Sequence, residues 1–424
     1  MRALRRASLQ PIGLPAALAA LTLSCGGDAT GPRPLPPATG SLRLTAATTG
    51  GGDDANGYTF SLDGGAARRV SANGVVTLDT LASGGHVLTL GDLASGCTLD
   101  GPNPRGVNLA ADAVTDVAVS VWCASAPTHP AGTVAATRTL SAAPGAVAVS
   151  RDGVVYAALA GTTQLVRGDL ATMTFGTTVV DVHATPIRVA FNPAGTTAYV
   201  ALAAPARVAI VNVATNQLSA VVQFADDQAE YASDAAGVAV SPDGSKVYVS
   251  SAVGHLWVMD AATLAIRGVP YFTDATGPLA FAPDGKTLYA AGHDGGLAVV
   301  DVASNTLTSA TGFGQLLDAM AISPDGRTLY AVEATYGLTA LDVASSQPVF
   351  RKVYDTPVVG VAASPDGAQL YVTEPDHGLV RVYDRATMSD VGAITTGGSP
   401  REVLFDPSGT TALVVTDQGV VFVR

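Results

Sequence analysis

The sequence predicts an all-β protein in which a small antiparallel β-sandwich precedes a seven-bladed β-propeller. A turn pattern close to Ser-Pro-Asp-Gly, as at 241–244, recurs seven times from residue 150 onward. Successive turn glycines are 42, 49, 41, 41, 41 and 42 residues apart. Regular repeats of ~40 to 45 residues that each hold several short strands are typical of propeller blades. The turn glycines are Gly153, Gly195, Gly244, Gly285, Gly326, Gly367 and Gly409.

The composition agrees with this fold class. Of the 424 residues, 48% are hydrophobic and 14% are charged, and the 46 glycines and 25 prolines suit short buried strands joined by tight turns. A chain of this length is expected to form two folded parts. The formal net charge of -12 repels phosphate backbones, so no nucleic-acid partner is expected.

Residues 1–24 have the pattern of an export signal. Three arginines among the first six residues precede an apolar run at 12–23, which is too short to span a bilayer. Residues 21–27 then resemble a bacterial lipoprotein signal, with Thr22 where that family usually has leucine. The resemblance implies cleavage before Cys25, a lipid on Cys25 and a lipoprotein of the bacterial cell envelope, on its periplasmic or cell-surface side. Ordinary cleavage near the same place is the alternative.

A tether is predicted at 25–40. Four prolines lie between residues 32 and 37 among glycine, alanine and threonine, and such a composition cannot build a core and tends to be extended. The tether is expected to hold the folded parts away from the membrane. The lipid anchor is then the only membrane contact.

The remaining two cysteines are predicted to form a disulfide. If Cys25 carries lipid, Cys97 and Cys123 are left as an even pair in an exported protein. Two free buried thiols are the alternative. A metal site is not expected, because the two cysteines are 26 residues apart with no histidine between them.

Residues 41–125 are predicted to form the antiparallel β-sandwich. Short segments that alternate apolar and polar residues are separated by Asn-Gly or Asp-Gly pairs at 56–57, 63–64 and 73–74, which favour hairpin turns. The region resembles the carboxypeptidase-regulatory-like modules of exported bacterial proteins. That resemblance implies a spacer or adhesion module rather than a catalyst. A short linker follows at 126–131.

Each repeat predicts four strands. The first ends at the turn, the second carries a tyrosine such as Tyr248, the third ends on an aspartate such as Asp260, and a fourth follows. These patterns resemble the YVTN family of seven-bladed propellers over residues 132–424, with Arg151 in the place of the turn proline in the first repeat. The resemblance implies a fold but no single activity, because relatives include binding proteins, lactonases and subunits of quinoprotein dehydrogenases.

The last repeat ends one strand short of four. Residues 133–140 have the spacing of a fourth strand relative to the first turn, so they are predicted to complete the seventh blade and to join the two ends of the repeat region.

No catalytic residue, cofactor or metal is expected. The turn aspartates recur from blade to blade, which indicates turn formation rather than chemistry. The sequence lacks a Gly-x-Ser-x-Gly elbow, a glycine-rich nucleotide loop and a His-Glu-x-x-His motif.

Binding residues are instead expected on one rim of the propeller, here called the top rim. It carries the connections between the second and third strands and those between blades. One inter-blade crossing is about eight residues longer than its equivalents, and long loops are common sites of function. The candidate residues on these loops are Asp226, Glu230, Tyr231, Asp234, His293, Asp294, Glu333, Tyr336, Glu374, Asp376 and His377.

Three functions follow as hypotheses. The first is a non-enzymatic, surface-tethered recognition protein that binds a protein or peptide, as a monomer, through the top rim. The second is a metal-dependent lactonase or lyase-like propeller enzyme, which requires His293, Glu333, Glu374, Asp376 and His377 to converge in groups of three or more. The third is a structural component of the cell envelope with no defined pocket.

Overall fold

The computed structural model describes residues 38–50, 57–94, 97–123, 132–203, 205–224, 235–251, 254–268, 275–292, 295–312, 316–334 and 337–424. The predicted export signal, Cys25, most of the tether and the linker at 126–131 lie outside these ranges. The regular secondary structure of the described chain is all β-strand, apart from one 3-10 segment, η1 (Pro375–His377). Within it, no helix combines the length and apolar character needed to cross a membrane.

The first folded part is a sandwich of two four-stranded sheets, in the orders β4-β1-β8-β6 and β3-β2-β5-β7. The strands of the first sheet are β1 (Thr39–Gly50), β4 (Val75–Ala82), β6 (Cys97–Leu99) and β8 (Val114–Cys123). Those of the second are β2 (Tyr58–Leu62), β3 (Arg68–Val70), β5 (Gly84–Gly91) and β7 (Arg105–Leu109).

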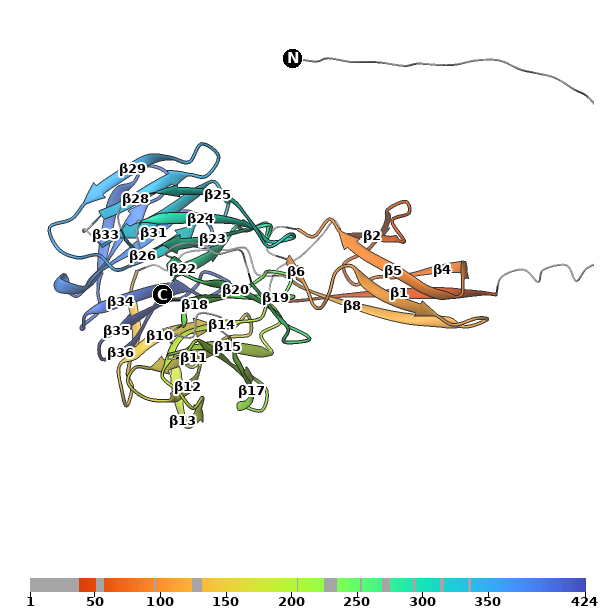
Figure 1. The fold of residues 1–424 in the computed structure, drawn as a ribbon, viewed down its shortest axis with the longest axis horizontal. Coiled ribbons are helices and arrows are strands. Elements are labelled where there is room, and N and C mark those ends of the chain that lie inside the picture. Colours follow the sequence, from red (N-terminus) through yellow and green to blue (C-terminus); the bar gives the residue numbers. More distant parts are fainter. Residues whose placement is uncertain are drawn as a thin grey trace, which may run out of the picture.

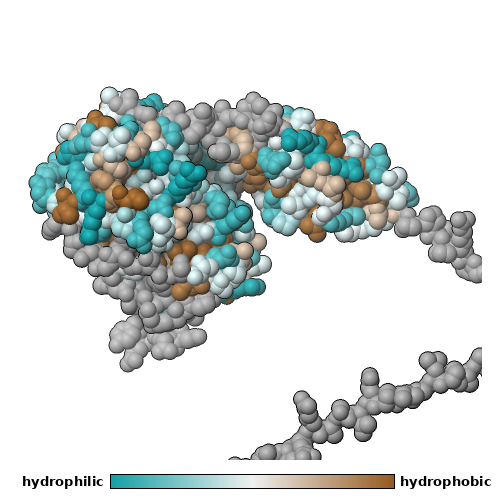
Figure 2. All heavy atoms as spheres, turned by 90° about the horizontal axis from the view of Figure 1, so that it is seen from above, coloured by the Kyte–Doolittle hydropathy of each residue, from teal (hydrophilic) through white to brown (hydrophobic). Residues whose placement is uncertain are grey.

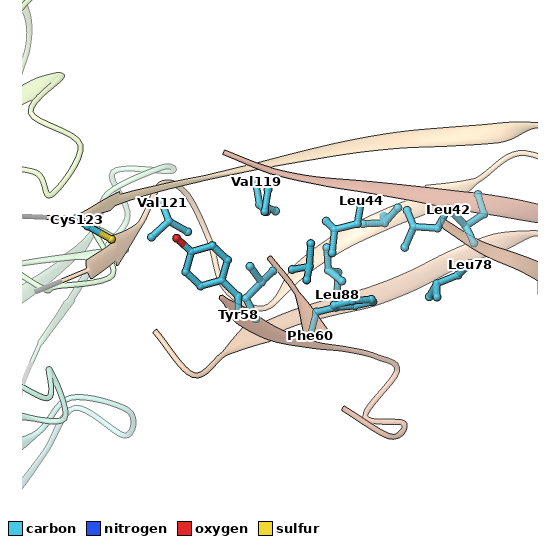
Figure 3. Close-up of a cluster of buried hydrophobic side chains, with 14 residues drawn as sticks. Leu42, Leu44, Tyr58, Phe60, Leu78, Leu88, Val119, Val121 and Cys123 are labelled. Atoms are coloured by element: carbon cyan, nitrogen blue, oxygen red, sulfur yellow. The ribbon is translucent and has the colours of Figure 1, made fainter. Parts of the chain in front are cut away.

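The sandwich core lies between the facing sides of the two sheets. Leu42 and Leu44 of β1 are fully buried, as are Tyr58 and Leu88 of the opposite sheet, and Figure 3 shows these side chains pointing toward one another. Alternate residues of β1 therefore face inward, as the sequence pattern predicts. One expectation is wrong: β1 and β8 pair in parallel, so the first sheet is mixed rather than antiparallel. Six strands separate these two along the chain, which leaves room for the return that a parallel pair needs.

The disulfide between Cys97 and Cys123 is confirmed, with an S–S distance of 2.01 Å. It joins the short edge strand β6 to the last residue of β8, and these two cysteines are also paired in register within the sheet. The bond therefore lies at the end of the sandwich where the chain leaves it.

Among the described residues, seven more four-stranded sheets follow. The first holds β10 (Pro144–Val149), β11 (Val154–Leu159), β12 (Gln164–Asp169) and β13 (Thr174–Asp181). The second holds β14 (Pro186–Phe191), β15 (Thr197–Leu202), β16 (Arg207–Asn212) and β17 (Gln217–Gln223). The third holds β18 (Ala235–Val240), β19 (Lys246–Ser251), β20 (Leu256–Asp260) and β21 (Ile266–Gly268).

The fourth sheet holds β22 (Ala275–Phe281), β23 (Thr287–Gly292), β24 (Gly296–Asp301) and β25 (Thr306–Gly312). The fifth holds β26 (Leu317–Ile322), β27 (Thr328–Glu333), β28 (Gly337–Asp342) and β29 (Gln347–Val353). The sixth holds β30 (Gly360–Ala363), β31 (Gln369–Glu374), β32 (Leu379–Asp384) and β33 (Ser389–Thr395). The seventh holds β34 (Pro400–Phe405), β35 (Ala412–Thr416), β36 (Gly419–Val423) and β9 (Val134–Thr139).

These sheets are arranged as the blades of a β-propeller (Figure 1). The first strand of each sheet contacts the first strand of the next, and β10 also contacts β34, so the first strands follow one another around a central axis. The strand β9, within the stretch 133–140, pairs with β36, and the backbones of Thr133 and Arg424 exchange two hydrogen bonds of 2.8 Å. The two ends of the repeat region therefore share one sheet.

Aromatic pairs fill the space between neighbouring blades. Tyr156 of β11 stacks on Phe191 of β14 with ring centroids 5.5 Å apart, and Tyr371 of β31 meets Phe405 of β34 at 4.9 Å. In each pair, a second-strand tyrosine packs on the phenylalanine that ends the first strand of the next blade. The repeated tyrosines are therefore packing residues, as the sequence indicates.

The turn aspartates also have a structural role. Asp243 accepts hydrogen bonds from the Ser241 hydroxyl at 2.5 Å and the Ser245 backbone N–H at 3.0 Å. Gly244 adopts a φ of 71°, which a residue with a side chain rarely tolerates. The turns that these bonds stabilise lie on the rim opposite the top rim, which we call the turn rim.

The sandwich meets the propeller at the turn rim, through the residue that replaces proline in the first repeat. Arg151 donates to both carboxylate oxygens of Asp100, at 2.6 and 3.3 Å, and its guanidinium lies 5.7 Å from the ring centroid of Trp122. Figure 2 shows the sandwich projecting from the propeller as a separate lobe. The top rim is consequently the rim that faces away from this contact.

Candidate ligand-binding channel

Four of the eleven predicted top-rim residues lie in the described part of the chain: Glu333, Glu374, Asp376 and His377. The other seven lie outside it, so the structure gives no account of them. They are Asp226, Glu230, Tyr231, Asp234, His293, Asp294 and Tyr336.

Glu333, the last residue of β27, is buried and satisfied within its own blade. One carboxylate oxygen accepts a hydrogen bond of 2.5 Å from the Thr339 hydroxyl, and the other lies 2.8 Å from Nη2 of Arg351. Only 1% of the residue is exposed. Its carboxylate is therefore committed to fifth-blade contacts and does not face a ligand.

Glu374 holds the equivalent position at the end of β31, and it is also paired. Nε of Arg381 donates to Oε1 at 2.8 Å, and Nδ1 of His377 lies 2.9 Å from Oε2. Burial acts to raise the pKa of Glu374, but the bonds from Arg381 and His377 outweigh it, so the net pKa is lowered. Arg381 also reaches Asp390 at 2.9 Å, and its own pKa is raised by the bond to Glu374.

Asp376 and His377 lie in η1 and are exposed. Within the described ranges, no group of three or more histidine, cysteine, aspartate or glutamate side chains is placed to hold a metal ion. The convergence required by the enzyme hypothesis is therefore not met by Glu333, Glu374, Asp376 and His377. His293 lies outside these ranges.

A second set of charged residues lies inside the propeller. A cavity of about 240 Å³ runs between the first strands of the blades, and a hollow of about 490 Å³ adjoins it. Both are lined by four charged residues from three blades: Arg188, Asp318, Arg401 and Glu402. We call the cavity the channel and the adjoining hollow the channel mouth.

The channel mouth opens toward the top rim. Besides the charged residues, it is lined by Pro357, Pro375 and Ser399. Pro375 begins the connection between the second and third strands of the sixth blade, and the two others precede first strands, where the chain crosses between blades. All three belong to top-rim connections. The predicted rim therefore does carry a pocket, but its charged lining comes from first strands rather than from loops.

The charged groups of the channel are less fully partnered than those of the blades. Among the described residues, Nη1 of Arg188 donates only to the backbone oxygens of Gly145 and Ile187, at 3.4 and 3.1 Å. The side chains of Arg401 and Asp318 make no hydrogen bond or ion pair with any residue in the described part of the chain. Burial raises the pKa of Asp318.

Glu402 is the least exposed of the four groups: it is partly exposed in the channel, and desolvation by the surrounding protein raises its pKa. Arg188 and the Val147 backbone N–H, which lies 3.3 Å from Oε2, oppose the rise in part. Glu402 therefore contacts the first blade from the seventh, beside an arginine of the second.

A comparison of equivalent positions in the seven repeats, outside the turn motifs, identifies these charged residues. The residue seven places before each turn glycine lies on a first strand, and six of these seven residues line the channel. Five of the seven are glycine, alanine or proline. The two exceptions are Arg188 and Glu402. The residue one place earlier is charged only at Asp318 and Arg401. Departures from a repeat's small-residue positions thus identify the channel, whereas loop charges do not.

The comparisons with known proteins support the fold alone. No family model and no curated protein matches the chain. Among solved structures, the chain is similar to one described as Kuenenia stuttgartiensis hydrazine synthase, with a TM-score of 0.58 and 18% sequence identity. The match covers 70% of this chain and 99% of that one. At this identity the likeness agrees with a β-propeller and carries no activity to this chain.

Proposed function

We propose that this protein is an exported, lipid-anchored recognition module without catalytic activity. A seven-bladed propeller of the YVTN type binds a peptide or protein ligand at its top rim, and the protein acts as a monomer. The observation that carries the proposal is the channel mouth, a pocket of about 490 Å³ on the rim that faces away from the sandwich. Pockets of ~300 to 1,000 Å³ with a few converging polar groups are typical of ligand sites.

The sandwich acts as a stalk in this proposal. The strand β1 begins at the end of the sandwich far from the propeller, and β8 ends beside the propeller (Figure 1). A chain anchored at Cys25 would thus hold the propeller at a distance from the membrane, with its top rim presented outward. Intact-mass analysis of membrane-extracted protein checks the lipid, and an unmodified Cys25 in the mature protein contradicts it.

The first prediction tests the binding rim with a displayed library of random peptides, panned against the immobilised full chain. Replacing Tyr231 and Tyr336 by alanine should weaken binding of the recovered peptides at least tenfold, because an aromatic hot spot contributes about 2 kcal/mol. The melting temperature should not change, because both tyrosines are predicted to lie on surface loops, where substitutions rarely affect a core.

The matched control is the pair Lys286→Ala and Arg327→Ala, which are exposed on the turn rim. Loss of binding in the control with retention in the tyrosine variant would place recognition on the turn rim instead. A library that yields no binder would favour the structural-component hypothesis.

A further inference from the structure

We propose that the channel mouth binds the carboxylate of a peptide, with Arg401 as its principal guanidinium partner and Arg188 as the second. The inference rests on the proposed function and deepens it by naming the group that is recognised. The carboxylate belongs either to the C-terminus of the peptide or to an acidic side chain, and the experiment below separates these sources.

The arginines of the channel are available to a ligand because no carboxylate of the described chain binds them. Three arginines elsewhere are engaged by carboxylates: Arg351 by Glu333, Arg381 by Glu374 and Arg151 by Asp100. Arg401, in contrast, has no partner among the described residues. A guanidinium presents a rigid fork of N–H donors that matches a carboxylate in geometry and charge, so an open arginine in a pocket favours such a ligand.

Asp318 lines the same mouth, and its side chain has no partner in the described chain. A peptide segment carries backbone N–H donors next to its carboxylate, so it can satisfy Asp318 and Arg401 together. Inorganic phosphate offers few hydrogen-bond donors to Asp318. The pairing of an open arginine with an open aspartate therefore favours a peptide over a simple anion.

The size of the site limits what can enter it. The volume of the mouth is about 490 Å³, and that of the adjoining channel is about 240 Å³. A folded domain cannot enter such a space, whereas a chain end or one side chain can. Gly237 and Gly360 also line the channel, and a Cβ atom at either position would clash with protein atoms rather than enter the channel.

The two carboxyl groups of the channel, Asp318 and Glu402, oppose an anionic ligand only weakly. Burial raises the pKa of both Asp318 and Glu402, which reduces the negative charge that they present. Arg188 lies close enough to Glu402 to influence its ionisation, so it offsets the remaining charge there. The arginines therefore govern the electrostatics of the mouth.

The experiment uses the full chain and matched peptide arrays made from the sequences recovered by panning. Each peptide is prepared with a free C-terminal carboxylate, with a C-terminal amide, and with its acidic side chains converted to amides. We expect one of the two carboxylate sources to be required, with at least a tenfold loss of affinity when it is removed.

Arg401→Ala should reproduce that loss for the carboxylate peptides and have little effect on their amide forms. Arg188→Ala should have a smaller effect in the same direction. Arg267→Ala, on the outer strand β21 where the side chain is exposed, is the control and should bind as the parent does. Inorganic phosphate should compete poorly.

Two outcomes overturn the inference separately from the proposed function. If amide forms without acidic side chains bind as tightly as the carboxylate forms, peptides are recognised but carboxylates are not. If phosphate displaces the peptides at concentrations near their own, the arginines bind anions without selecting peptides. Failure of every peptide to bind would overturn the proposed function and the inference together.

Discussion

The buried ion pairs of the fifth and sixth blades and the open charges of the channel differ in one respect that decides their roles. In the blades, Glu374 and Arg381 are joined by bonds of 2.8 and 3.2 Å, and each group is satisfied. In the channel, Arg401 and Asp318 line a pocket without partners among the described residues. The comparison teaches that pairing, rather than the number of charges near a rim, separates structural groups from groups available to a ligand.

The largest loss of stability is expected when the ion pair of the sixth blade is removed. Arg381→Ala leaves Glu374 buried without its main partner, and removing one member of a buried pair costs about 3 kcal/mol or more. Urea unfolding at pH 7 measures the loss. Arg351→Ala should cost less, about 1 to 2 kcal/mol, because Arg351 donates one bond and is half exposed.

The ion pair of Glu374 and Arg381 should also make the stability of the protein depend on pH. Because the pKa of Glu374 is lowered in the native state, its ionisation stabilises the fold above the ordinary glutamate pKa of about 4.3. That contribution is lost as the pH falls through the lowered native value. The difference between the parent and Arg381→Ala should therefore shrink below about pH 4, and a constant difference would show that the arginine acts through packing instead.

Glu402 should behave in the opposite way. Its native pKa is raised, so the native state binds more protons than the unfolded state above the ordinary glutamate pKa, and ionisation destabilises the fold. Glu402→Gln is expected to stabilise the protein on the order of 1 kcal/mol at pH 7. It should have no effect under acidic conditions. Destabilisation at pH 7 would indicate that Glu402 is instead a required contact of the first and seventh blades.

The smallest effect on unfolding is expected at Arg151, whose ion pair joins two folded parts rather than two strands of one blade. Arg151→Pro restores the residue found in the other turns and removes both the bond to Asp100 and the contact with Trp122. We expect at most about 1 kcal/mol of lost stability but a wider spread of sandwich orientations in small-angle scattering. An unchanged scattering profile would show that other contacts fix the junction.

Much of the fold could be predicted because its signals are local and repeated. The turn aspartates bond within a few residues of themselves, and the tyrosines of three blades pack on a phenylalanine that ends the first strand of the next blade. The stretch 133–140 could be assigned a strand from spacing alone. Each of these features depends on short-range geometry that the amino-acid order sets directly.

The candidate site was predicted only in part, because charge on a rim does not reveal what the charge contacts. Glu333 and Glu374 were selected as ligand residues, yet each is buried against an arginine of its own blade. Arg188 and Glu402 are not among the predicted residues, although they interrupt a position that is glycine, alanine or proline in the other five repeats. Asp318 and Arg401 are likewise missing, although they are the only charged residues at the position before it. Reading the repeats position by position would have found them.

The sequence by itself predicted the four-strand repeats, their spacing, the turns and, with Cys25 carrying lipid, the pairing of Cys97 with Cys123. Tertiary structure alone decided that β1 pairs in parallel with β8, that Arg151 binds Asp100, and which charges of the propeller are left open. The physical reason is that these contacts do not belong to the repeat pattern. The bonds of Arg151 to Asp100 and of the Val147 N–H to Glu402 join residues 51 and 255 positions apart at single sites, so they depend on how whole sheets pack.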